Sequence, residues 1–266
     1  MPAGTRVYFE LAKQTFRRKT AYLAATAAGV FTNTVFGFLL AYVLLAVYEQ
    51  RSDVGGFDPV DAVTFTFVAQ GLLLVVGLFG DNEIVDRIRT GEVISDLSRP
   101  VDYQAWWAAA AYGRAAFNLV FRGVPPFIVG ALAFDLRLPA ATTWPWFLLS
   151  VTVAVAVGYS WKFLLSLTGF WVVDGRGAAA MGWVLSAFLS GMYVPLVFLP
   201  DGLASVARAL PFAAMLQLPV EVFLGKHPGA GAAGVVALQV AWGVALLGLG
   251  RLVLARAVRR VVVNGG

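Results

Sequence analysis

Long apolar runs alternate with short polar segments along the whole chain. Six of these runs hold about 20 or more mostly apolar residues, the length that an α-helix needs to cross the hydrocarbon core of a bilayer. The pattern therefore predicts an all-α membrane protein with six transmembrane helices in a single domain over residues 1–266. The expected spans are residues 22–48, 62–80, 105–134, 144–173, 178–199 and 230–254.

The polar segment between the second and third runs has a helical pattern of its own. Its apolar positions fall at helical spacing on both sides of Gly91, which predicts two short amphipathic helices with a break at the glycine. Glu83 and Arg87 are spaced to pair along the polar face. The segment is either an ordinary interfacial helix or a contact surface for a soluble partner. It covers residues 81–100, and its apolar positions are Ile84, Val85, Ile88, Val93, Ile94 and Leu97.

The start of the chain, residues 7–20, is too charged to cross a bilayer but has an amphipathic helical pattern. We expect this helix to lie along the inner membrane surface. There it serves either as an elbow that ties the first span to the membrane plane or as an anchor whose cations reach the head groups. Its apolar side is formed by Tyr8, Leu11, Thr15 and Phe16.

The chain after the fifth run is apolar, but prolines and glycines interrupt it too often for another span. Two brief helices are expected, at residues 203–210 and 213–224, separated by Pro211. Irregular backbone at membrane depth needs protein or water around it, so this segment is predicted to re-enter the membrane shallowly and pack on neighbouring spans as an outer lid. The alternative is a plain outer loop with interfacial apolar residues. The residues expected to shape the outer gate are Pro195, Pro200 and Pro211.

Composition and charge agree with a membrane protein and predict its orientation. Apolar residues make up 59% of the chain, mean hydropathy is +0.77, and only 13% of residues are charged. Cationic loops stay in the cytoplasm, and the side of the N-terminus carries most of the lysines and arginines, so both termini are expected inside. The net charge of +5 fits anionic lipid at that surface and does not call for nucleic acid. The inner cations are Arg6, Lys13, Arg17, Arg18, Lys19, Arg87, Arg89, Arg99, Arg176, Arg251, Arg256, Arg259 and Arg260, and the outer ones are Arg51, Arg137, Arg208 and Lys226.

Charged side chains inside the expected spans are candidate substrate contacts, because a charge at the membrane centre costs roughly 2.5–3.5 kcal/mol and is rarely accidental. Arg114, Asn118 and Arg122 recur every four residues and therefore share one face of the third span. They either meet an anionic substrate, or Arg114 reaches the head groups while Arg122 pairs between helices. Lys162 in the fourth span has the same two interpretations.

Amides and aromatic residues also stand together in the first two spans. Asn33 and Phe36 belong to the first span and Gln70 to the second. A mixed polar and aromatic lining suits an amphiphilic substrate. Amides within spans nevertheless more often bridge helices, at about 0.6 kcal/mol each, so packing is the favoured role for each of them.

The sequence offers no catalytic constellation. His227 is the only histidine, and neither a zinc-binding H-E-x-x-H motif nor a G-x-x-x-x-G-K-S phosphate loop occurs. We therefore expect no metal, no cofactor and no ATP hydrolysis in this chain. An ion-coupled secondary transporter is the main alternative, but it would need buried acids, and all fifteen Asp and Glu fall in loops or at span ends. An intramembrane enzyme is the more distant alternative.

Several short motifs in order along the chain are similar to those of a known family. They are R-T-G-E-V-I-S-D-L-S-R-P at 89–100, S-G-M-Y-V-P-L at 190–196, L-P-D-G at 199–202, A-L-P-F at 209–212 and L-P-V-E-V-F-L-G at 218–225. With the N-terminal amphipathic helix and the six expected spans, the chain resembles a membrane subunit of an ABC-2 type (type V) ATP-binding-cassette exporter, in particular the bacterial ABC-2 family transporter permeases. The resemblance covers nearly the whole chain.

The resemblance implies a dimer, with a second permease subunit that is identical or similar, and a cytoplasmic ATP-binding subunit that handles ATP and Mg. It implies that the 81–100 loop is a coupling helix on that ATPase, and that the second and fifth spans line the path. The expected coupling residues are Ile84, Arg87, Ile88, Arg89, Gly91, Asp96, Leu97 and Pro100. The expected pathway residues are Asn33, Phe36, Gln70, Trp183, Ser186, Ser190 and Gly191.

The expected function is therefore that of a permease subunit in a bacterial plasma membrane, exporting a lipophilic or amphiphilic compound. The largely apolar spans favour such a compound over an ion or a sugar. The sequence names neither the substrate nor the direction of transport. Small residues of the fifth span, such as Ser190 and Gly191, also allow close helix approach, which is the competing explanation for them.

Overall fold

The computed structural model describes residues 3–79, 82–172 and 174–264, and these residues form helices joined by turns, with no strand. Gly80 and Val173, where two of the expected spans end, and Asp81 lie outside the described residues. The longer helices are α1 (Ala3–Thr20), α2 (Leu23–Tyr48), α3 (Pro59–Leu72), α6 (Tyr103–Asn118), α7 (Val124–Ala133), α8 (Trp144–Leu167), α9 (Arg176–Leu189) and α13 (Ala230–Asn264). The shorter ones are α4 (Glu83–Arg89), α5 (Val93–Leu97), α10 (Asp201–Ala209), α11 (Pro211–Met215), α12 (Gln217–Phe223), the π-helical turn η1 (Leu119–Gly123) and the 3₁₀ turns η2 (Thr168–Phe170) and η3 (Leu196–Phe198).

Four helical segments of the described chain are long and apolar enough to cross a membrane: Leu23–Tyr48, Tyr103–Ala133, Trp144–Phe170 and Ala230–Arg260. They coincide with four of the six expected spans, so the prediction of an all-α membrane protein is confirmed at this level. The other two expected spans contain α3 and α9, which have 14 residues each. At a rise of 1.5 Å per residue each is about 21 Å long, shorter than the ~30 Å hydrocarbon core. That the chain crosses the membrane six times therefore remains a prediction.

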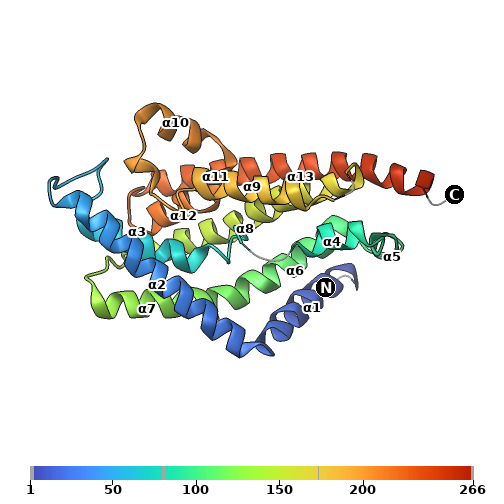
Figure 1. Ribbon diagram of the computed structural model, residues 1–266, viewed down its shortest axis with the longest axis horizontal. Helices are drawn as coiled ribbons and strands as arrows, with labels where there is room; N and C mark the ends of the chain where they lie inside the picture. Colours follow the sequence, from blue (N-terminus) through green and yellow to red (C-terminus); the bar gives the residue numbers. More distant parts are fainter. Residues whose placement is uncertain (1–2, 80–81, 173, 265–266) are drawn as a thin grey trace.

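Helix α8 packs against α4, α6, α9, α11, α12 and α13 (Figure 1). Helices α2, α3 and α7 pack against one another, and α1 packs on α6. The largest group of buried apolar residues joins α3, α8, α11 and α12. At one end of the molecule lie α1, α4, α5 and the end of α13; the start of α3 and the end of α7 lie at the opposite end (Figure 1). The two ends of the molecule are thus formed by different segments of the chain.

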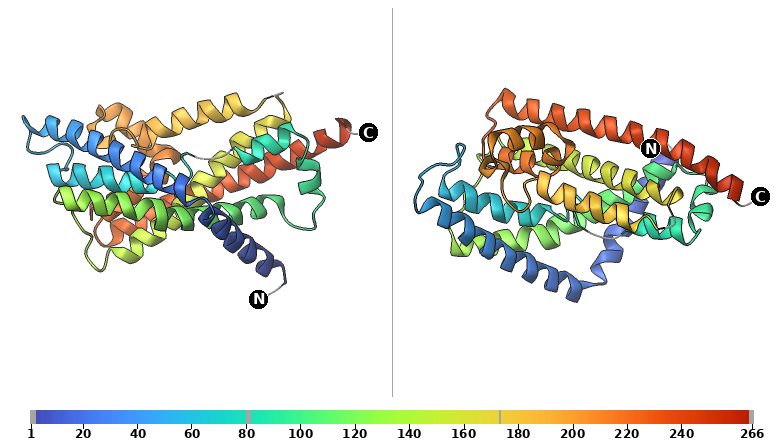
Figure 2. Two further views of the ribbon diagram at one scale, coloured as in Figure 1. Left: turned by 60° about the horizontal axis from the view of Figure 1, so that its bottom comes forward. Right: turned by 45° about the horizontal axis from the view of Figure 1, so that its top comes forward.

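Helix α1 runs at a steep angle to the long helices and turns into α2 (Figure 2). It packs on α6, where Gly113 lets the backbone of Ala12 approach so closely that a Cβ would overlap it. Phe16 meets the ring of Phe117 edge-on, with centroids 5.7 Å apart. The predicted N-terminal amphipathic helix is thus present.

The second expected span is broken in the structure. Helix α3 ends at Leu72 and residues 73–79 continue as turns. Their backbone is held by neighbouring helices: Asn118 of α6 donates a hydrogen bond to the carbonyl oxygen of Leu74 at 3.0 Å, and Gly158 of α8 leaves room for the carbonyl oxygen of Val76. Irregular backbone deep in a membrane protein requires such partners.

Helices α10, α11 and α12 form a short helical array after η3. Helix α10 corresponds to the predicted helix at 203–210, whereas the predicted helix at 213–224 is divided into α11 and α12. Every residue of α11 and α12 is buried. Gln217 connects the array to the irregular chain before it, because its backbone N–H donates to Ser190 O at 3.1 Å while its side-chain oxygen accepts from Leu196 N at 3.1 Å. The array is therefore a packed part of the protein. Re-entry into the membrane stays a prediction.

Candidate functional site

The loop between α3 and α6 folds as the two short helices that the sequence predicts, α4 and α5. Gly91 stands between them with φ +79°, a backbone conformation that residues with a side chain rarely adopt. The turn is closed by hydrogen bonds from Gly91 N to Ile88 O and from Ile94 N to Gly91 O, both 3.2 Å. The predicted break at Gly91 is confirmed.

An ion pair locks the two short helices together. The Arg87 guanidinium donates from Nη2 to Asp96 Oδ1 at 2.8 Å and also from Nε to Oδ2, and its Nη1 lies 3.0 Å from Glu92. The hydrogen bond to Asp96 raises the pKa of Arg87. The sequence predicted that Arg87 would pair with Glu83. Glu83 instead lies 4.0 Å from Arg114 of α6, at the edge of ion-pair distance.

The apolar side of this loop faces the rest of the protein. Ile84 and Ile88 are each 9% exposed and belong to a cluster of buried residues with Tyr103, Phe163 and Leu167 of α6 and α8. This corrects the expectation that Ile84 and Ile88 are coupling residues in contact with an ATPase, because their side chains are covered by their own chain. Their helical spacing correctly predicted an apolar face, but it does not determine which surface covers that face.

A second ion pair ties the loop to α9. Arg176, the first residue of α9, donates to Asp86 of α4 from Nη2 at 2.7 Å and from Nε at 3.1 Å. This contact raises the pKa of the Arg176 guanidinium. The loop is therefore joined to α6 and α8 through apolar packing and to α9 through charge.

The opposite side of the loop is exposed and mixes charge with one large apolar side chain. Ile94 is 56% exposed. Of the predicted coupling residues, Arg89, Gly91 and Pro100 are exposed here, Leu97 is half-buried, and Arg87 and Asp96 hold the bend. The exposed surface, called here the loop face, consists of Arg89, Thr90, Gly91, Glu92, Ile94, Ser95, Ser98, Arg99 and Pro100.

The predicted pathway residues fall in separate places. Trp183 and Ser186 of α9 line one cavity of about 330 Å³, in which the Trp183 ring lies 5.0 Å from the ring of Phe79. Ser190 and Gly191 are buried in the irregular chain after α9, where Gly191 has φ +81°. The structure thus brings together only two of these four residues of the fifth expected span.

Of the predicted pathway residues in the first two spans, two form a contact between helices and the third is an exposed aromatic side chain. Asn33 donates to the carbonyl oxygen of Gln70 at 3.3 Å, and both residues are buried, so they join α2 to α3. This agrees with the packing interpretation. Phe36 is 53% exposed, so much of its ring is not covered by the rest of the protein.

The three prolines of the predicted outer gate each stand at the start of a helical turn. Pro195 precedes η3, Pro200 precedes α10, and Pro211 is the first residue of α11. Pro195 and Pro211 are buried, whereas Pro200 is exposed. Proline is favoured at helix starts because its fixed φ is helical and its missing N–H is not needed there.

A buried carboxylate in α12 was not foreseen from the sequence. Glu221 accepts hydrogen bonds from Arg208 at 2.5 and 3.1 Å and from Gln217 at 2.8 Å, and it lies 2.9 Å from His227 Nε2. Burial would raise the pKa of Glu221, but the contacts with His227, Arg208 and Gln217 outweigh it and lower the pKa to about 2. The carboxylate is thereby kept ionised inside the protein.

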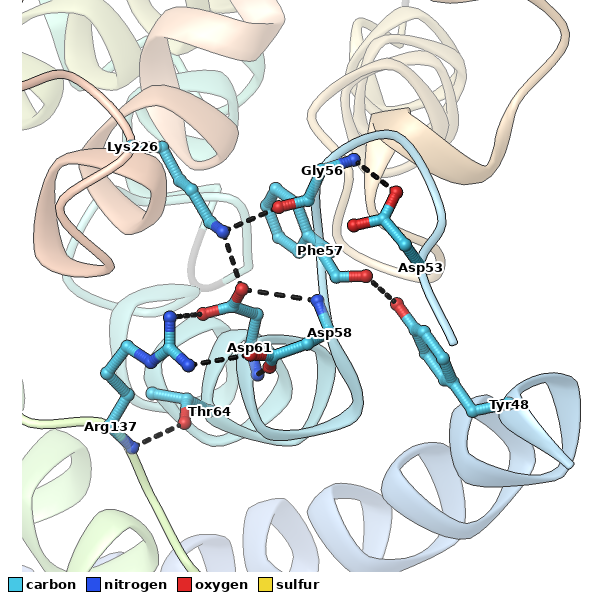
Figure 3. A network of polar contacts seen from close by, with 9 residues as sticks. All are labelled: Tyr48, Asp53, Gly56, Phe57, Asp58, Asp61, Thr64, Arg137 and Lys226. Carbon is cyan, nitrogen blue, oxygen red and sulfur yellow. Dashed lines mark hydrogen bonds and ion pairs between the residues drawn. The ribbon is translucent and has the colours of Figure 1, made fainter. Parts of the chain in front are cut away.

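A second buried carboxylate, Asp61, stands at the start of α3 (Figure 3). Its side chain is 1% exposed and forms ion pairs with Lys226 and Arg137, the latter at 3.0 Å. Asp58 caps the helix, accepting from Asp61 N at 2.7 Å, and pairs with Arg137 at 2.7 Å. The D-P-x-D pattern before an apolar run is a capping signal that could have located this network. Three of the four cations that the sequence predicts for the outer side thus pair with Asp61, Asp58 or Glu221.

The described residues include no group of three or more His, Asp or Glu that could hold a metal ion. An all-helical chain with four apolar helices of membrane-crossing length is a multi-pass membrane protein. The family model of the ABC-2 family transporter proteins matches residues 31–265. The chain therefore belongs to the ABC-2 family transporter proteins, the membrane permease subunits of ABC transporters. No curated protein and no solved structure matches it.

Proposed function

We propose that this chain is the permease subunit of an ABC exporter and that its loop face receives a separate cytoplasmic ATPase subunit, which binds ATP and Mg. The observation that carries the proposal is the locked loop. Its exposed side is free for a partner, whereas its buried side is fixed to α6, α8 and α9. A displacement of the loop by a partner would therefore be passed to three helices at once.

The proposal includes an orientation. The loop face, α1 and the end of α13 stand at the same end of the molecule (Figure 1), and this end carries the cations of the N-terminus, the loop and the C-terminus. Three of the four cations predicted for the opposite end, Arg137, Arg208 and Lys226, are in ion pairs with Asp58, Asp61 or Glu221. Since cationic loops stay inside, the loop face is on the cytoplasmic side with both termini.

We further propose that two permease subunits, identical or similar, form the transport path of a lipophilic or amphiphilic compound in the plasma membrane of a bacterium. The family of the chain supports a membrane permease that works with an ATP-binding subunit. Helix α9 offers an exposed apolar face that includes Met181 at 73% and Phe188 at 63% exposure, which requires cover by lipid or by a second subunit. The single-domain organisation over residues 1–266 belongs to the same proposal.

The ion-coupled alternative finds no support in the buried carboxylates. Such a carrier needs an acid that exchanges its coupling ion. Asp61, Asp96 and Glu221 are buried. Lys226 and Arg137 neutralise Asp61, Arg87 neutralises Asp96, and Arg208 neutralises Glu221. Carboxylates held by permanent cations are structural, so the geometry favours the ABC permease.

The test is association with the ATPase. The chain, purified in mild detergent from its native host, is expected to carry a protein with a G-x-x-x-x-G-K-[ST] phosphate loop in stoichiometric amount, and the complex is expected to hydrolyse ATP. Ile94→Asp on the loop face should reduce the ATPase retained at least about tenfold, the effect of losing roughly 1.4 kcal/mol of affinity. Leu138→Asp is the matched control, because Leu138 is 68% exposed at the opposite end.

Retention of the ATPase by the Leu138→Asp chain and its loss from the Ile94→Asp chain would support the proposal. Both chains should elute as folded protein, since each substitution changes an exposed side chain. Equal retention by the two variants would contradict the assignment of the loop face. A chain that moves a solute along an ion gradient without any ATPase would replace the proposed function by that of a carrier.

A further inference from the structure

A cavity of about 350 Å³ lies where the start of α2 meets α6, α8 and the irregular segment 73–79. Four cationic side chains line it, one each from α1, α6, η1 and α8: Lys19, Arg114, Arg122 and Lys162. Among the described residues that line this cavity there is no aspartate or glutamate. Cationic side chains from four helical elements therefore meet at this cavity.

The two arginines have hydrogen-bonding capacity left over. Arg114 Nη1 and Arg122 Nε are buried and have no hydrogen-bond partner among the described residues. Glu83 pairs with Arg114 only at 4.0 Å, which is beyond hydrogen-bond distance, and it shares its Oε2 with Arg18 at 3.8 Å. Buried charged donors are costly unless an acceptor meets them. An anionic group in the cavity would supply that acceptor.

The fold also makes room for one of these side chains. The Arg122 guanidinium packs against Gly29 of α2, at a place where a Cβ would overlap it. A guanidinium presents its donors in a planar fork that matches the oxygens of a phosphate or a carboxylate. The absence of a side chain at Gly29 therefore leaves room for the Arg122 guanidinium between α2 and η1.

A second cavity, of about 330 Å³, adjoins the first and shares Gly77, Phe79, Gly158 and Lys162 with it. Its remaining lining is mostly apolar and includes Trp161 of α8 and Trp183 of α9. A cationic cavity that continues into an aromatic and aliphatic one is complementary to an amphiphile with an anionic head and an apolar chain.

We propose that the two cavities together bind one amphiphile whose anionic head group lies between Arg114 and Arg122 and whose apolar chain extends along Trp161 and Trp183. The first cavity lies beside the bend between α1 and α2, where we expect an interfacial helix to meet a span. The ligand is either an anionic phospholipid of the surrounding leaflet or a transported compound of the same chemistry. The second source rests on the proposed export function.

The binding test uses the full chain in mild detergent and native mass spectrometry with phosphatidylglycerol and phosphatidylcholine of equal chain length. The chain should retain phosphatidylglycerol roughly tenfold better, and the double variant Arg114→Gln/Arg122→Gln should lose this preference. Arg114→Lys/Arg122→Lys keeps the charge and should restore part of it. Arg256→Gln is the matched control, because Arg256 is exposed near the end of α13.

Competition tests the apolar half of the site. Decyl phosphate should displace bound phosphatidylglycerol, whereas inorganic phosphate at the same concentration should not. Equal retention of the two lipids by the unaltered chain would overturn the proposal even if the double variant does not fold. Displacement by inorganic phosphate as effective as that by decyl phosphate would overturn it as well.

ATP hydrolysis by the complex of the chain with its ATPase distinguishes the two possible sources of the ligand. Stimulation of ATP hydrolysis by added phosphatidylglycerol or decyl phosphate, lost in the glutamine double variant, identifies a transported amphiphile. Binding without stimulation identifies a resident lipid, and the site stands in either case. Because lipid retention is measured without the ATPase, failure of the binding site and failure of the proposed function give different results.

Discussion

Arg87 and Asp96 face each other across the Gly91 bend and form a two-point ion pair. Nine residues separate them, so the pair forms only when α4 and α5 fold back on one another. The Asp96 side chain is 5% exposed, which shields the contact from water. The pair therefore fixes the shape of the loop face that we propose as the ATPase contact.

Asp96→Asn should loosen the bend without unfolding the protein. The substitution removes the charge that faces Arg87, at an expected cost of about 2 kcal/mol in local stability. Amide hydrogen exchange over residues 83–97 should then become about 30-fold faster, while α8 and α13 stay protected. Ser95→Ala, at an exposed position of the same helix, serves as the control. Unchanged exchange in the Asp96→Asn chain would show that the pair does not hold the loop.

Ile88 and Ile94 should respond differently to truncation. Ile88→Ala removes a buried side chain that packs near Gly169 of the adjoining 3₁₀ turn, and it should lower the free energy of unfolding by about 2–4 kcal/mol. Ile94→Ala changes an exposed residue and should stay within about 0.5 kcal/mol. Thermal unfolding in detergent measures both. Equal losses would contradict the inward orientation of Ile88.

Gly158→Ala tests the docking of the broken second span. A Cβ at this position would overlap the carbonyl oxygen of Val76, so α8 and the irregular segment must separate, at about 1–3 kcal/mol. Gly248→Ala in α13 is the matched control, because no neighbouring atom lies within 4 Å of its Cβ. That control should be neutral or stabilising by up to about 1 kcal/mol, since alanine favours a helix. Similar melting temperatures for both variants would refute the close packing.

Glu221 should make stability depend on acid pH. Its pKa falls from 4.5 to about 2 on folding, so its contribution is fully present above about pH 4.5 and is lost as the pH falls towards 2. The contribution is on the order of 3 kcal/mol. Glu221→Gln should therefore flatten the melting temperature between pH 4.5 and 2, whereas Glu10→Gln, at the start of the chain, should leave the slope in place. An equally steep slope without the Glu221 carboxylate would assign the dependence to other groups.

The sequence predicted those helices and turns that are determined by residues close together in the chain. The spacing of Ile84 and Ile88 around Gly91 is enough to place two short amphipathic helices, because helical period and glycine conformation are properties of a few neighbouring residues. The same spacing does not say what covers the apolar face. That depends on Phe163 and Leu167, which are about 80 residues further along the chain.

Other features depend on tertiary contacts that hydropathy does not report. Residues 62–80 carry no charge and are mostly apolar, yet the helix stops at Leu72. Asn118 and Gly158 from other helices accommodate the irregular backbone that follows. The burial of Asp61 requires Lys226 to arrive from a distant turn. The cationic cavity was foreseen only in part, since the shared face of Arg114 and Arg122 is visible in the sequence and the apolar cavity beside it is not.

The most direct test of the account is the accessibility of one thiol on the loop face. The chain has no cysteine, so Ser95→Cys introduces a unique one at an exposed position of α5. In intact cells an impermeant maleimide should leave it unlabelled. In inside-out vesicles the thiol should react, and binding of the ATPase subunit should protect it. Labelling from outside intact cells, or equal labelling with and without the bound ATPase, would contradict the claim that this loop is the cytoplasmic contact with the ATPase.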